Sequence, residues 1–544
     1  MTVINAAEYK IVPDSHVGSA LAALFNKLSE IDGEKALVFE SGNYYIDAAE
    51  LEYEMLYITN TVGDKEFKKG EIPHRVRTAL NLKNIKDLRI EGNGAKFIVC
   101  GTATNAALQH CENIEINDIE IDVENPDMHE MAVIAKGKHF VDFQIDACST
   151  YSVEGGKLYF NGVDYKTDAL KKYRAAWHTG CVKKDTPNTI KRTHHLFLSA
   201  IKAKDLGDGK VRIYYLNNSQ IEIGDRYYVF HNRRDNVGIF IDFCKDITLN
   251  SVSQRFNYSL AIVAQNTENI TLNKLDFSPN KNSGRLVAST ADFIQICMCK
   301  GKVTVENSYF DGACDDCINV HGVHFKIKSI EANKITVQFM HPQAHGFNPI
   351  HLGDEIAFIN PATMLECGRA TAISSKLINE YQLEIALDNT ENAKIGHCIE
   401  DVTMCPELEF KNNVMTRIIT RGILLTTRGK SVIESNRFVS TSMSGILLSD
   451  DASSWYESGM CCDVTIKDNV FEHCADHAIL IKPENVIHSG AVHKNIKIIG
   501  NEFKDYGDTC MNIKSSSDIE ISGNTFANDN RLTVKNCENI VKDF

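Results

Sequence analysis

The sequence lacks a long apolar run, and it lacks an excess of basic residues. None of its 544 residues lies in a stretch with the length and apolarity of a membrane-spanning helix. The first eight residues contain neither the basic nor the apolar region of a secretion signal. The net charge of −14 disfavours nucleic acid, anionic membranes and polyuronates as partners. We therefore expect a cytoplasmic protein with no nucleic-acid or membrane partner, or an exported one if a signal has been removed.

A disulfide framework and a zinc-ligand pattern are also missing. The seventeen cysteines are an odd number and are scattered, which suits a reducing compartment and small apolar core residues. One C-x-x-C motif is present, Cys314 to Cys317, but no second pair follows at a suitable spacing. We expect no metal and no cofactor.

What the sequence does contain is a repeat. Short strand signals recur along most of the chain, each with Asn, Asp or Lys before a pair rich in Ile and Val. Ile247 and Ile270 are 23 residues apart, as are Ile496 and Ile519. A period in the low twenties with three short strands per turn is typical of a right-handed parallel β-helix. The leucine consensus of leucine-rich repeats is missing, and a β-propeller would need a longer repeat. The predicted fold class is all-β, a right-handed parallel β-helix, or solenoid.

A second signature, Asn-x-Phe, follows several of these strands. Asparagine tolerates the left-handed backbone of a tight turn, and its amide can bond to the same residue one turn of the solenoid away. We therefore expect a ladder of stacked asparagines, formed by Asn436, Asn469, Asn501 and Asn524.

Two stretches break the period, from about Ala132 to Val237 and from about Val323 to Cys405. Both are rich in alternating strands, and they contain the similar segments Ile223–Phe230 and Leu352–Phe358. They predict two small β-barrel modules inserted into the turns of the solenoid. The expected domains are the N-terminal cap and first rungs (1–131), the first barrel (132–237), the rungs with the acids (238–322), the second barrel (323–405) and the C-terminal rungs (406–544).

The N-terminal segment has helical spacing of apolar residues. We expect it to form an amphipathic helix that caps the first rung, because an open solenoid end would expose core and strand edges. The apolar residues concerned are Val17, Leu21, Leu24, Phe25 and Leu28.

One column of the repeat is polar where a turn column is more often Asn, Gly or Ser. The segments starting at Asp316, Arg421, Ser444 and His477 align without gaps, and Asp292 precedes a segment of the same pattern. Their first residues should therefore stack along one edge of the solenoid. A solvated turn column is the plain alternative.

Three carboxylates gather in this column. Asp292 and Asp316 are 24 residues apart, so they would lie on neighbouring rungs about 4.8 Å apart, and Asp315 is next to Asp316. Like charges at that range drive pKa values apart, which suits a general acid and a base that hydrolyse a glycosidic bond. The sequence does not assign the two roles. Arg421, in the same column, is a further candidate binding residue.

A loop from Asp450 to Gly459 leaves the same side of the solenoid. It contains Trp455, one of two tryptophans in the chain, together with Asp451 and Glu457. An indole beside carboxylates suits a sugar, which stacks its apolar face on the ring while the acids bind its hydroxyls. A tryptophan that packs the loop onto the solenoid is the alternative. His321 and His345 should lie near the cluster by the same register.

Motifs spread over nearly the whole chain resemble glycoside hydrolase family 110. They are Ser283-Gly284-Arg285, Ser289-Thr290-Ala291-Asp292, Asp315-Asp316-Cys317-Ile318-Asn319-Val320-His321-Gly322, and Asp451-Ala452 with Trp455-Tyr456-Glu457-Ser458-Gly459. Members of that family are inverting exo-α-1,3-galactosidases on a right-handed β-helix with inserted barrels. They remove terminal α-1,3-linked galactose from branched blood group B structures or from linear glycans.

The resemblance also implies roles for individual residues. Asp292, Asp315 and Asp316 would form the catalytic acid cluster. The galactose pocket would be shaped by Arg285, Asn319, His321, Trp455 and Glu457. The family's proteins are usually exported, and this chain departs from them by its missing signal and its many cysteines.

Three other functions remain open from sequence. A polygalacturonase-like hydrolase also places aspartates on adjacent rungs, but needs basic residues for uronate carboxylates, for which Arg285 and Arg421 are the obvious candidates. A polysaccharide lyase would use Ca²⁺ and a Lys or Arg base on an anionic substrate. A non-catalytic glycan-binding β-helix would need the groove without the acid pair.

Overall fold

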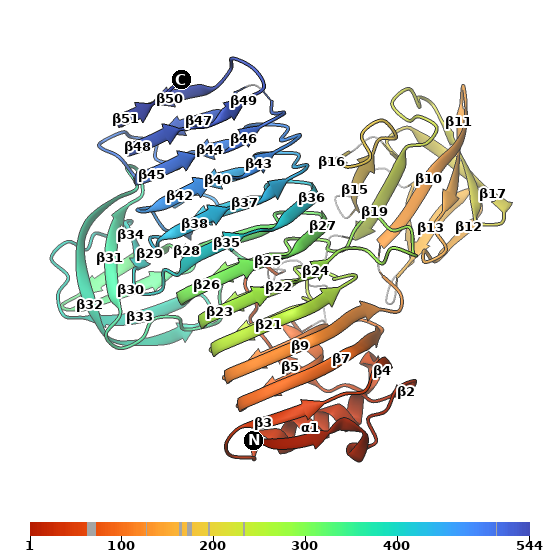
Figure 1. The fold of residues 1–544 in the computed structure, drawn as a ribbon, viewed down its shortest axis with the longest axis horizontal. Coiled ribbons are helices and arrows are strands. Elements are labelled where there is room, and N and C mark those ends of the chain that lie inside the picture. The colour runs from red at the N-terminus through yellow and green to blue at the C-terminus, as the bar shows by residue number, and fades with distance from the viewer. Residues whose placement is uncertain are drawn as a thin grey trace.

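The computed structural model shows a long parallel β-helix with one insert on each side (Figure 1). It describes residues 1–61, 72–126, 128–162, 166–170, 177–193, 196–231, 234–507 and 509–544. The N-terminus lies at one end of the solenoid and the C-terminus at the other. Within the described residues no helix is long and apolar enough to cross a membrane.

The largest sheet runs the length of the solenoid. It has 22 strands within the described residues. They are β1 (Thr2–Asn5), β2 (Ser15–His16), β3 (Lys35–Val38), β4 (Gly42–Asp47), β7 (Lys86–Cys100), β9 (Glu112–Val123), β21 (Lys245–Gln254), β23 (Glu268–Asn273), β24 (Asp276–Phe277), β26 (Lys300–Glu306), β27 (Tyr309–Ala313), β35 (Glu407–Lys411), β36 (Val414–Ile418), β38 (Ser431–Glu434), β39 (Arg437–Phe438), β42 (Val464–Lys467), β43 (Val470–Phe471), β45 (His493–Ile499), β46 (Glu502–Phe503), β48 (Ser516–Ser522), β49 (Thr525–Phe526) and β51 (Glu538–Lys542).

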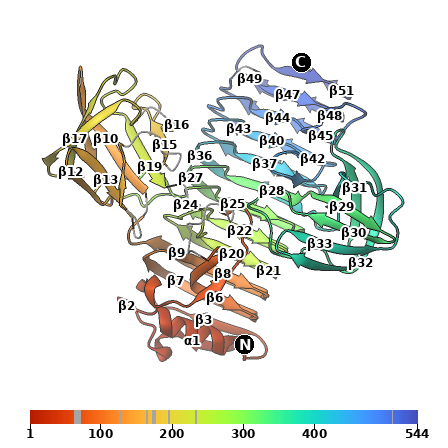
Figure 2. The same ribbon diagram turned by 180° about the vertical axis from the view of Figure 1, so that it is seen from behind.

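A second sheet, seen from behind in Figure 2, closes the solenoid and carries the acids. Its strands are β5 (Tyr53–Met55), β6 (Arg75–Lys83), β8 (Thr104–Gln109), β20 (Ile239–Asp242), β22 (Ile262–Gln265), β25 (Ile294–Cys297), β28 (Ile318–Val323), β37 (Ile423–Thr426), β40 (Ile446–Leu448), β44 (Ile479–Ile481), β47 (Met511–Lys514) and β50 (Leu532–Lys535), with β41 (Glu457–Ser458) paired to β28.

The register of the second sheet is the one that the sequence pattern predicts. Ile294 pairs with Ile318, Ile318 with Ile423, Ile423 with Ile446, and Ile446 with Ile479, all in parallel. Each of these isoleucines is fully buried. A shift by one residue would turn the whole apolar column outward, so burial of the isoleucines fixes the register.

The predicted asparagine ladder is present in the turns. Asn436 donates from its side chain to Asn469, Asn469 to Asn501, and Asn501 to Asn524, each at 3.0 Å. Beside it the rings of Phe438, Phe471, Phe503 and Phe526 stack at centroid distances of 4.6–5.3 Å. The ladders satisfy the buried polar groups of the turns and fill the core next to them.

The N-terminal end is capped as expected. Helix α1 (Gly18–Ser29) buries Leu21, Leu24, Phe25 and Leu28, which belong to the solenoid core. Two short 3₁₀ helices, η1 (Ala6–Tyr9) and η2 (Ala48–Glu50), lie near it in the chain.

The first insert is predicted over 132–237, and its described strands run from Met128 to His231. They form a seven-stranded antiparallel sheet and a three-stranded one, with a core of their own. The first sheet contains β10 (Met128–Gly137), β11 (Phe140–Ile145), β15 (Trp177–Val182), β16 (Ile190–Arg192), β17 (Ala200–Gly207), β18 (Lys210–Tyr215) and β19 (Arg226–His231), and the second contains β12 (Tyr151–Glu154), β13 (Lys157–Asn161) and β14 (Lys166–Asp168).

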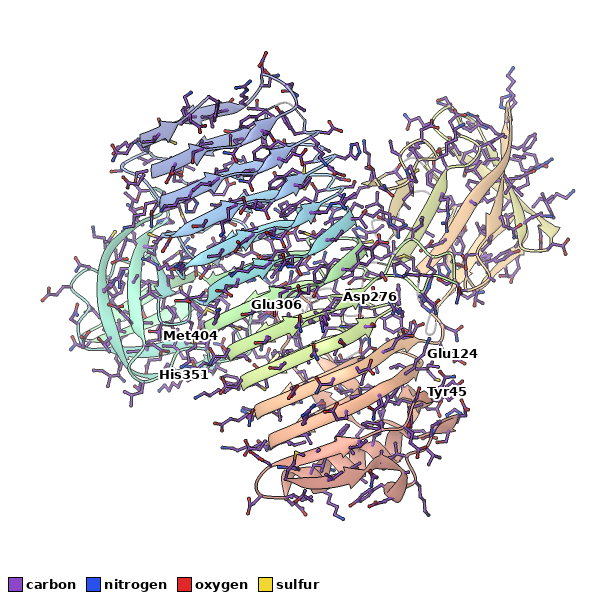
Figure 3. All side chains as sticks on the ribbon, viewed as in Figure 1. Tyr45, Glu124, Asp276, Glu306, His351 and Met404 are labelled. Atoms are coloured by element: carbon purple, nitrogen blue, oxygen red, sulfur yellow. The ribbon has the colours of Figure 1, made fainter. Side chains whose placement is uncertain are left out.

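The second insert is predicted over 323–405 and is a closed six-stranded barrel. Its strands are β29 (Phe325–Glu331), β30 (Lys334–Gln338), β31 (Glu355–Asn360), β32 (Leu365–Asn379), β33 (Gln382–Leu387) and β34 (Cys398–Asp401). His351 of this insert and Met404, just after its last strand, lie against the solenoid, where they line a groove of about 340 Å³ with Lys300 (Figure 3). Since β28 leads directly into β29, the barrel starts at the end of the strand that Asp316 precedes.

Candidate active site

The acid cluster forms where two neighbouring rungs enter the second sheet. Asp292 and Asp316 each lie two residues before a strand, β25 and β28, which pair in parallel. The backbone N–H of Asp316 donates to Asp292 Oδ1 at 3.3 Å. Both side chains are buried, with 2% of each residue exposed. The solenoid thus brings together two carboxyls from consecutive rungs.

Asp316 is held from the next rung. Arg421 donates to Asp316 Oδ1 through its backbone N–H and its Nε, both at 2.9 Å, and its Nη2 lies 2.8 Å from Oδ2. Thr420 Oγ1 donates to Asp316 Oδ1 at 2.5 Å. A forked guanidinium on both oxygens fixes the carboxylate in position and compensates its charge. Arg421 is therefore a partner of the cluster.

Asp315 is held by arginines in and just after the first insert. Arg234 Nη2 donates to Asp315 Oδ2 at 2.5 Å, and Arg192 Nη2 lies 3.7 Å from Oδ1. Thr420 Oγ1 is 3.3 Å from Oδ1. No sequence pattern points to Arg192 or Arg234, because no repeat register relates residues of the insert to the column of acids.

The environments of Asp292 and Asp315 push their protonation in opposite directions. Burial, together with the charges of Asp315 and Asp316, raises the pKa of Asp292 well above its ordinary value, although Arg234 and Arg421 oppose the rise. Burial also acts to raise the pKa of Asp315, but Arg234 and Arg192 outweigh it, and the pKa of Asp315 is lowered. The site therefore favours the protonated form of one carboxyl and the ionised form of another, which is the division that acid/base catalysis requires.

A group of polar side chains lies beside the acids on β28 and will be called the sugar pocket, after its proposed role. Asn319 Nδ2 donates to Glu457 Oε1 at 3.0 Å, and His321 Nε2 lies 3.8 Å from the same oxygen. Glu457 reaches this place because β41 pairs antiparallel with β28, with Val323 opposite Glu457. The three predicted residues Asn319, His321 and Glu457 are thus brought together.

The loop before Glu457 is organised by Asp451. Its carboxylate accepts hydrogen bonds from the backbone N–H groups of Ser453 and Trp455 at 2.7 and 2.5 Å, and Ser454 Oγ donates to it at 2.7 Å. These bonds, led by that of the Ser454 hydroxyl, outweigh burial and lower the pKa of Asp451. The contacts of Asp451 are those of a residue that shapes the loop.

Trp455 itself remains accessible. It is 48% exposed and stacks on the ring of His341 from the second insert, with centroids 4.4 Å apart. Burial lowers the pKa of His341 to about 4, so that ring is neutral at physiological pH. The pair forms an aromatic surface that joins the loop to the barrel.

Two predicted binding residues have contacts outside the acid cluster. Arg285 Nη2 lies 3.3 Å from Asp122 Oδ1, and its guanidinium lies over the ring of Phe256 at 5.7 Å. His345 is buried between aromatic rings, stacked on Tyr381 at 4.4 Å and edge-on to Tyr57 at 5.9 Å. The contacts described for both residues are with neighbouring protein groups and not with the three aspartates.

Two amides that are not among the predicted site residues lie beside Asp292. Asn60 Nδ2 lies 3.4 Å from Asp292 Oδ2 and 2.6 Å from Gln295 Oε1. Gln295 was detectable in principle, because it follows Asp292 by three residues on the outward face of its strand. Asn60 was not, since more than 230 residues separate it from both partners. Among the residues described, no His, Cys, Asp and Glu side chains form a group that could hold a metal ion.

The fold and the site together define the class of protein. A parallel β-helix with clustered aspartates beside a group of polar side chains and an exposed tryptophan has the features of a β-helical glycoside hydrolase. Three family models match the chain: "GLAA-B beta-barrel domain I" over residues 129–226, "GLAA-B beta-barrel domain II" over 334–397, and "Right handed beta helix region" over 367–526. The predicted fold class is thereby confirmed, including its hand.

Curated relatives identify the family. An α-1,3-galactosidase A of Bacteroides fragilis is 36% identical over 514 residues, which cover 91% of this chain and 82% of the relative. An α-1,3-galactosidase A of Bacteroides thetaiotaomicron is 32% identical over 496 residues, which cover 89% and 84%. The chain belongs to glycoside hydrolase family 110, the family of these α-1,3-galactosidases.

Among solved structures, a family 28 exopolygalacturonase of Yersinia enterocolitica is similar to this chain. The match covers 99% of this chain and 78% of that chain, with 11% identity and a TM-score of 0.43.

Proposed function

We propose that this protein is an exo-acting, inverting α-1,3-galactosidase that hydrolyses terminal α-1,3-linked galactose from oligosaccharides or glycans. The observation that carries the proposal is the cluster of Asp292, Asp315 and Asp316, two of them in hydrogen-bond contact across rungs. The relatives named α-1,3-galactosidase over most of the chain support the substrate class.

The chemistry needs one carboxyl that protonates the leaving oxygen and one that deprotonates water. Positioned acid/base groups of this kind contribute roughly 10²- to 10⁴-fold each to the rate. The raised pKa of Asp292 and the lowered pKa of Asp315 supply both protonation states in one site. In the proposed reaction the water attacks the anomeric carbon on the face opposite the leaving group, so the configuration inverts.

The pocket beside the cluster suits one neutral sugar. Asn319, His321 and Glu457 offer donors and acceptors for its hydroxyls. Trp455 and His341 present an uncharged aromatic surface for an apolar face of a ring. The arginines of the site disfavour a polygalacturonase-like hydrolase and a polysaccharide lyase. Arg421 is bonded to Asp316 and Arg234 to Asp315. Both are therefore poorly suited to bind a uronate or to act as a lyase base.

The proposal is tested by galactose release from α-1,3-galactobiose and from its α-1,4 and α-1,6 isomers. We expect release from the α-1,3 isomer, and a loss of roughly three orders of magnitude or more in Asp316→Asn. Asp518→Asn, at an exposed residue of β48, is the matched control and should leave the rate unchanged. A substitution of Asp316 that leaves turnover intact in a folded protein would contradict the proposal.

We also propose that the protein functions in a reducing compartment, the cytoplasm. All seventeen cysteines have free thiols, many of them buried in the core. Fractionation of the cells that produce the protein tests this, and enzyme recovered from the periplasm or medium would contradict it.

A further inference from the structure

A line of side-chain hydrogen bonds connects the acid cluster to the sugar pocket. It starts at Asp292 Oδ2, 3.4 Å from Asn60 Nδ2, and continues from Asn60 Nδ2 to Gln295 Oε1 at 2.6 Å. Gln295 Nε2 then lies 3.0 Å from His321 Nε2. Gln295 and His321 are buried, with 1% and 4% exposed, so water does not replace these partners. We call Asp292, Asn60, Gln295 and His321 the amide chain.

The direction of every bond in the amide chain follows from one backbone carbonyl. His321 Nδ1 lies 2.7 Å from the oxygen of Gly322, which can only accept, so Nδ1 carries the proton. In the neutral ring Nε2 is then an acceptor, and Gln295 must donate to it through its NH₂ group. The oxygen of Gln295 therefore faces Asn60, and Asn60 must also turn its NH₂ group toward Gln295 and Asp292.

We propose that Asn60 and Gln295 are positioning residues, which hold an N–H donor against the carboxylate of Asp292 in a direction fixed by His321. The inference rests on the proposed function, in which Asp292 belongs to the acid cluster. An N–H donor favours the ionised carboxylate over the neutral carboxyl. The amide chain therefore limits the proton affinity of Asp292 and orients its Oδ2, while Asp316 N–H holds Oδ1.

The backbone around Asn60 is held by hydrogen bonds to both the solenoid and the second insert. Thr59 N–H donates to Gln265 Oε1, and Gln265 Nε2 donates to the carbonyl of Tyr57, both at 3.1 Å. Asn60 N–H donates to the carbonyl of Gln343 in the second insert at 2.8 Å. A side chain on so firmly held a backbone can serve as a rigid support for Asp292.

Other charges also act on the two ends of the amide chain. Asp315 and Asp316 disfavour ionisation of Asp292, whereas Arg234 and Arg421 favour it. At the other end, the imidazole of His321 faces Glu457 at 3.8 Å. Substitution of Asn60 or Gln295 leaves all of these groups in place, so a change in the pH profile reports the amide chain.

The test measures kcat/KM against pH for Asn60→Ala, Gln295→Leu and the double variant, with α-1,3-galactobiose. We expect the limb of the kcat/KM–pH profile that Asp292 controls to shift about one pH unit upward in each single variant. That shift corresponds to a tenfold change in the proton affinity of Asp292. The double variant should shift no further, because either substitution breaks the same chain. KM should stay within about twofold, because neither residue is placed in the sugar pocket.

Gln109→Leu is the matched control. Gln109 also lies on the second sheet and bonds to Glu54 and Asn81, at 3.1 and 3.3 Å. Its profile should coincide with that of the unaltered protein. The inference would be overturned if the pH profiles of both folded single variants were unchanged or shifted downward, even where galactose is released normally.

A second readout does not need turnover. In protein with ¹⁵N-labelled histidine, at a pH where the ring of His321 is neutral, that ring should show a protonated Nδ1 and a bare Nε2, assigned by loss of the signals in His321→Asn. Gln295→Leu should change the Nε2 signal, because its donor is gone. A protonated Nε2 with a bare Nδ1 would overturn the inference. An enzyme that released no galactose would refute the proposed function and leave this result standing.

Discussion

The backbone N–H of Asp316 donates to the carboxyl of Asp292 at 3.3 Å, although 24 residues separate them in the chain. The contact exists because Ile294 and Ile318 pair one rung apart and because each aspartate lies two residues before its isoleucine. The same burial that fixes this register also removes water from the acids. Packing of the core and activation of the carboxyls therefore have a common cause.

Dependence on the leaving group should identify the general acid. A p-nitrophenolate departs without a proton, whereas the sugar alkoxide of α-1,3-galactobiose needs one. We expect one of Asp292→Ala, Asp315→Ala and Asp316→Ala to retain about 100-fold more of its activity on p-nitrophenyl α-galactoside than on the disaccharide. Asp276→Ala, on the outer face of the large sheet, is the control. Equal losses on both substrates in all three variants would contradict acid catalysis by this cluster.

Asp292→Asn should stabilise the fold at neutral pH. The folded pKa of Asp292 is raised by burial first and then by Asp315 and Asp316. Its stabilising contribution is therefore present below the ordinary carboxyl pKa of about 3.9 and is lost as pH rises through the folded pKa. A neutral amide avoids that loss and still accepts from Asp316 N–H, although its NH₂ group then faces Asn60 Nδ2.

We expect the Tm of Asp292→Asn to exceed that of the unaltered protein by about 1–3 °C at pH 8, and the difference to vanish near pH 4. Scanning calorimetry at both pH values measures this. A lower Tm at pH 8 would show that ionised Asp292 stabilises the fold.

Asn469→Ala should destabilise the C-terminal rungs. Asn469 Oδ1 accepts from the backbone N–H of Asn436 at 2.9 Å, and its Nδ2 donates to the carbonyl of Ile433 at 2.9 Å. Loss of both leaves buried groups unpaired, at a cost of about 2–4 kcal/mol in the free energy of unfolding. Urea denaturation followed by circular dichroism measures the change. Asn524→Ala, at the half-buried end of the ladder, should lose less, and equal losses would argue against a burial effect.

Trp455→Ala should weaken substrate binding more than chemistry. The indole is 48% exposed and lies on the neutral ring of His341, so its removal takes away contact surface for a sugar. We expect KM for α-1,3-galactobiose to rise about tenfold and kcat to change by less than about threefold, consistent with the worth of an aromatic contact. Tyr309→Ala, a partly exposed aromatic on the large sheet, is the control. An unchanged KM would mean that Trp455 only joins the loop to the barrel.

The solenoid and its polar column could be predicted because both follow from a period. Ile294, Ile318 and Ile423 recur at positions that the core must bury, so their alignment also places Asp292, Asp316 and Arg421 in one column. The asparagine ladder is predictable for the same reason. Local sequence suffices wherever each rung repeats the geometry of the previous one.

The remaining contacts of the site have no such period. Arg192 of the first insert and Arg234, just after its last strand, both contact Asp315. Asn60 contacts Asp292 from a segment more than 230 residues earlier in the chain. Arg285 is only seven residues from Asp292, yet its guanidinium lies against Asp122. These pairings depend on how the inserts and loops pack on the solenoid, which a single sequence does not encode in any regular spacing.

Proton NMR of the anomeric signals during hydrolysis of α-1,3-galactobiose tests the proposed reaction most directly. An inverting acid/base reaction at the aspartate cluster predicts that β-galactose appears first and that α-galactose appears only by mutarotation. Initial release of α-galactose would contradict the inverting mechanism, and no release by the folded protein would contradict the proposed function itself.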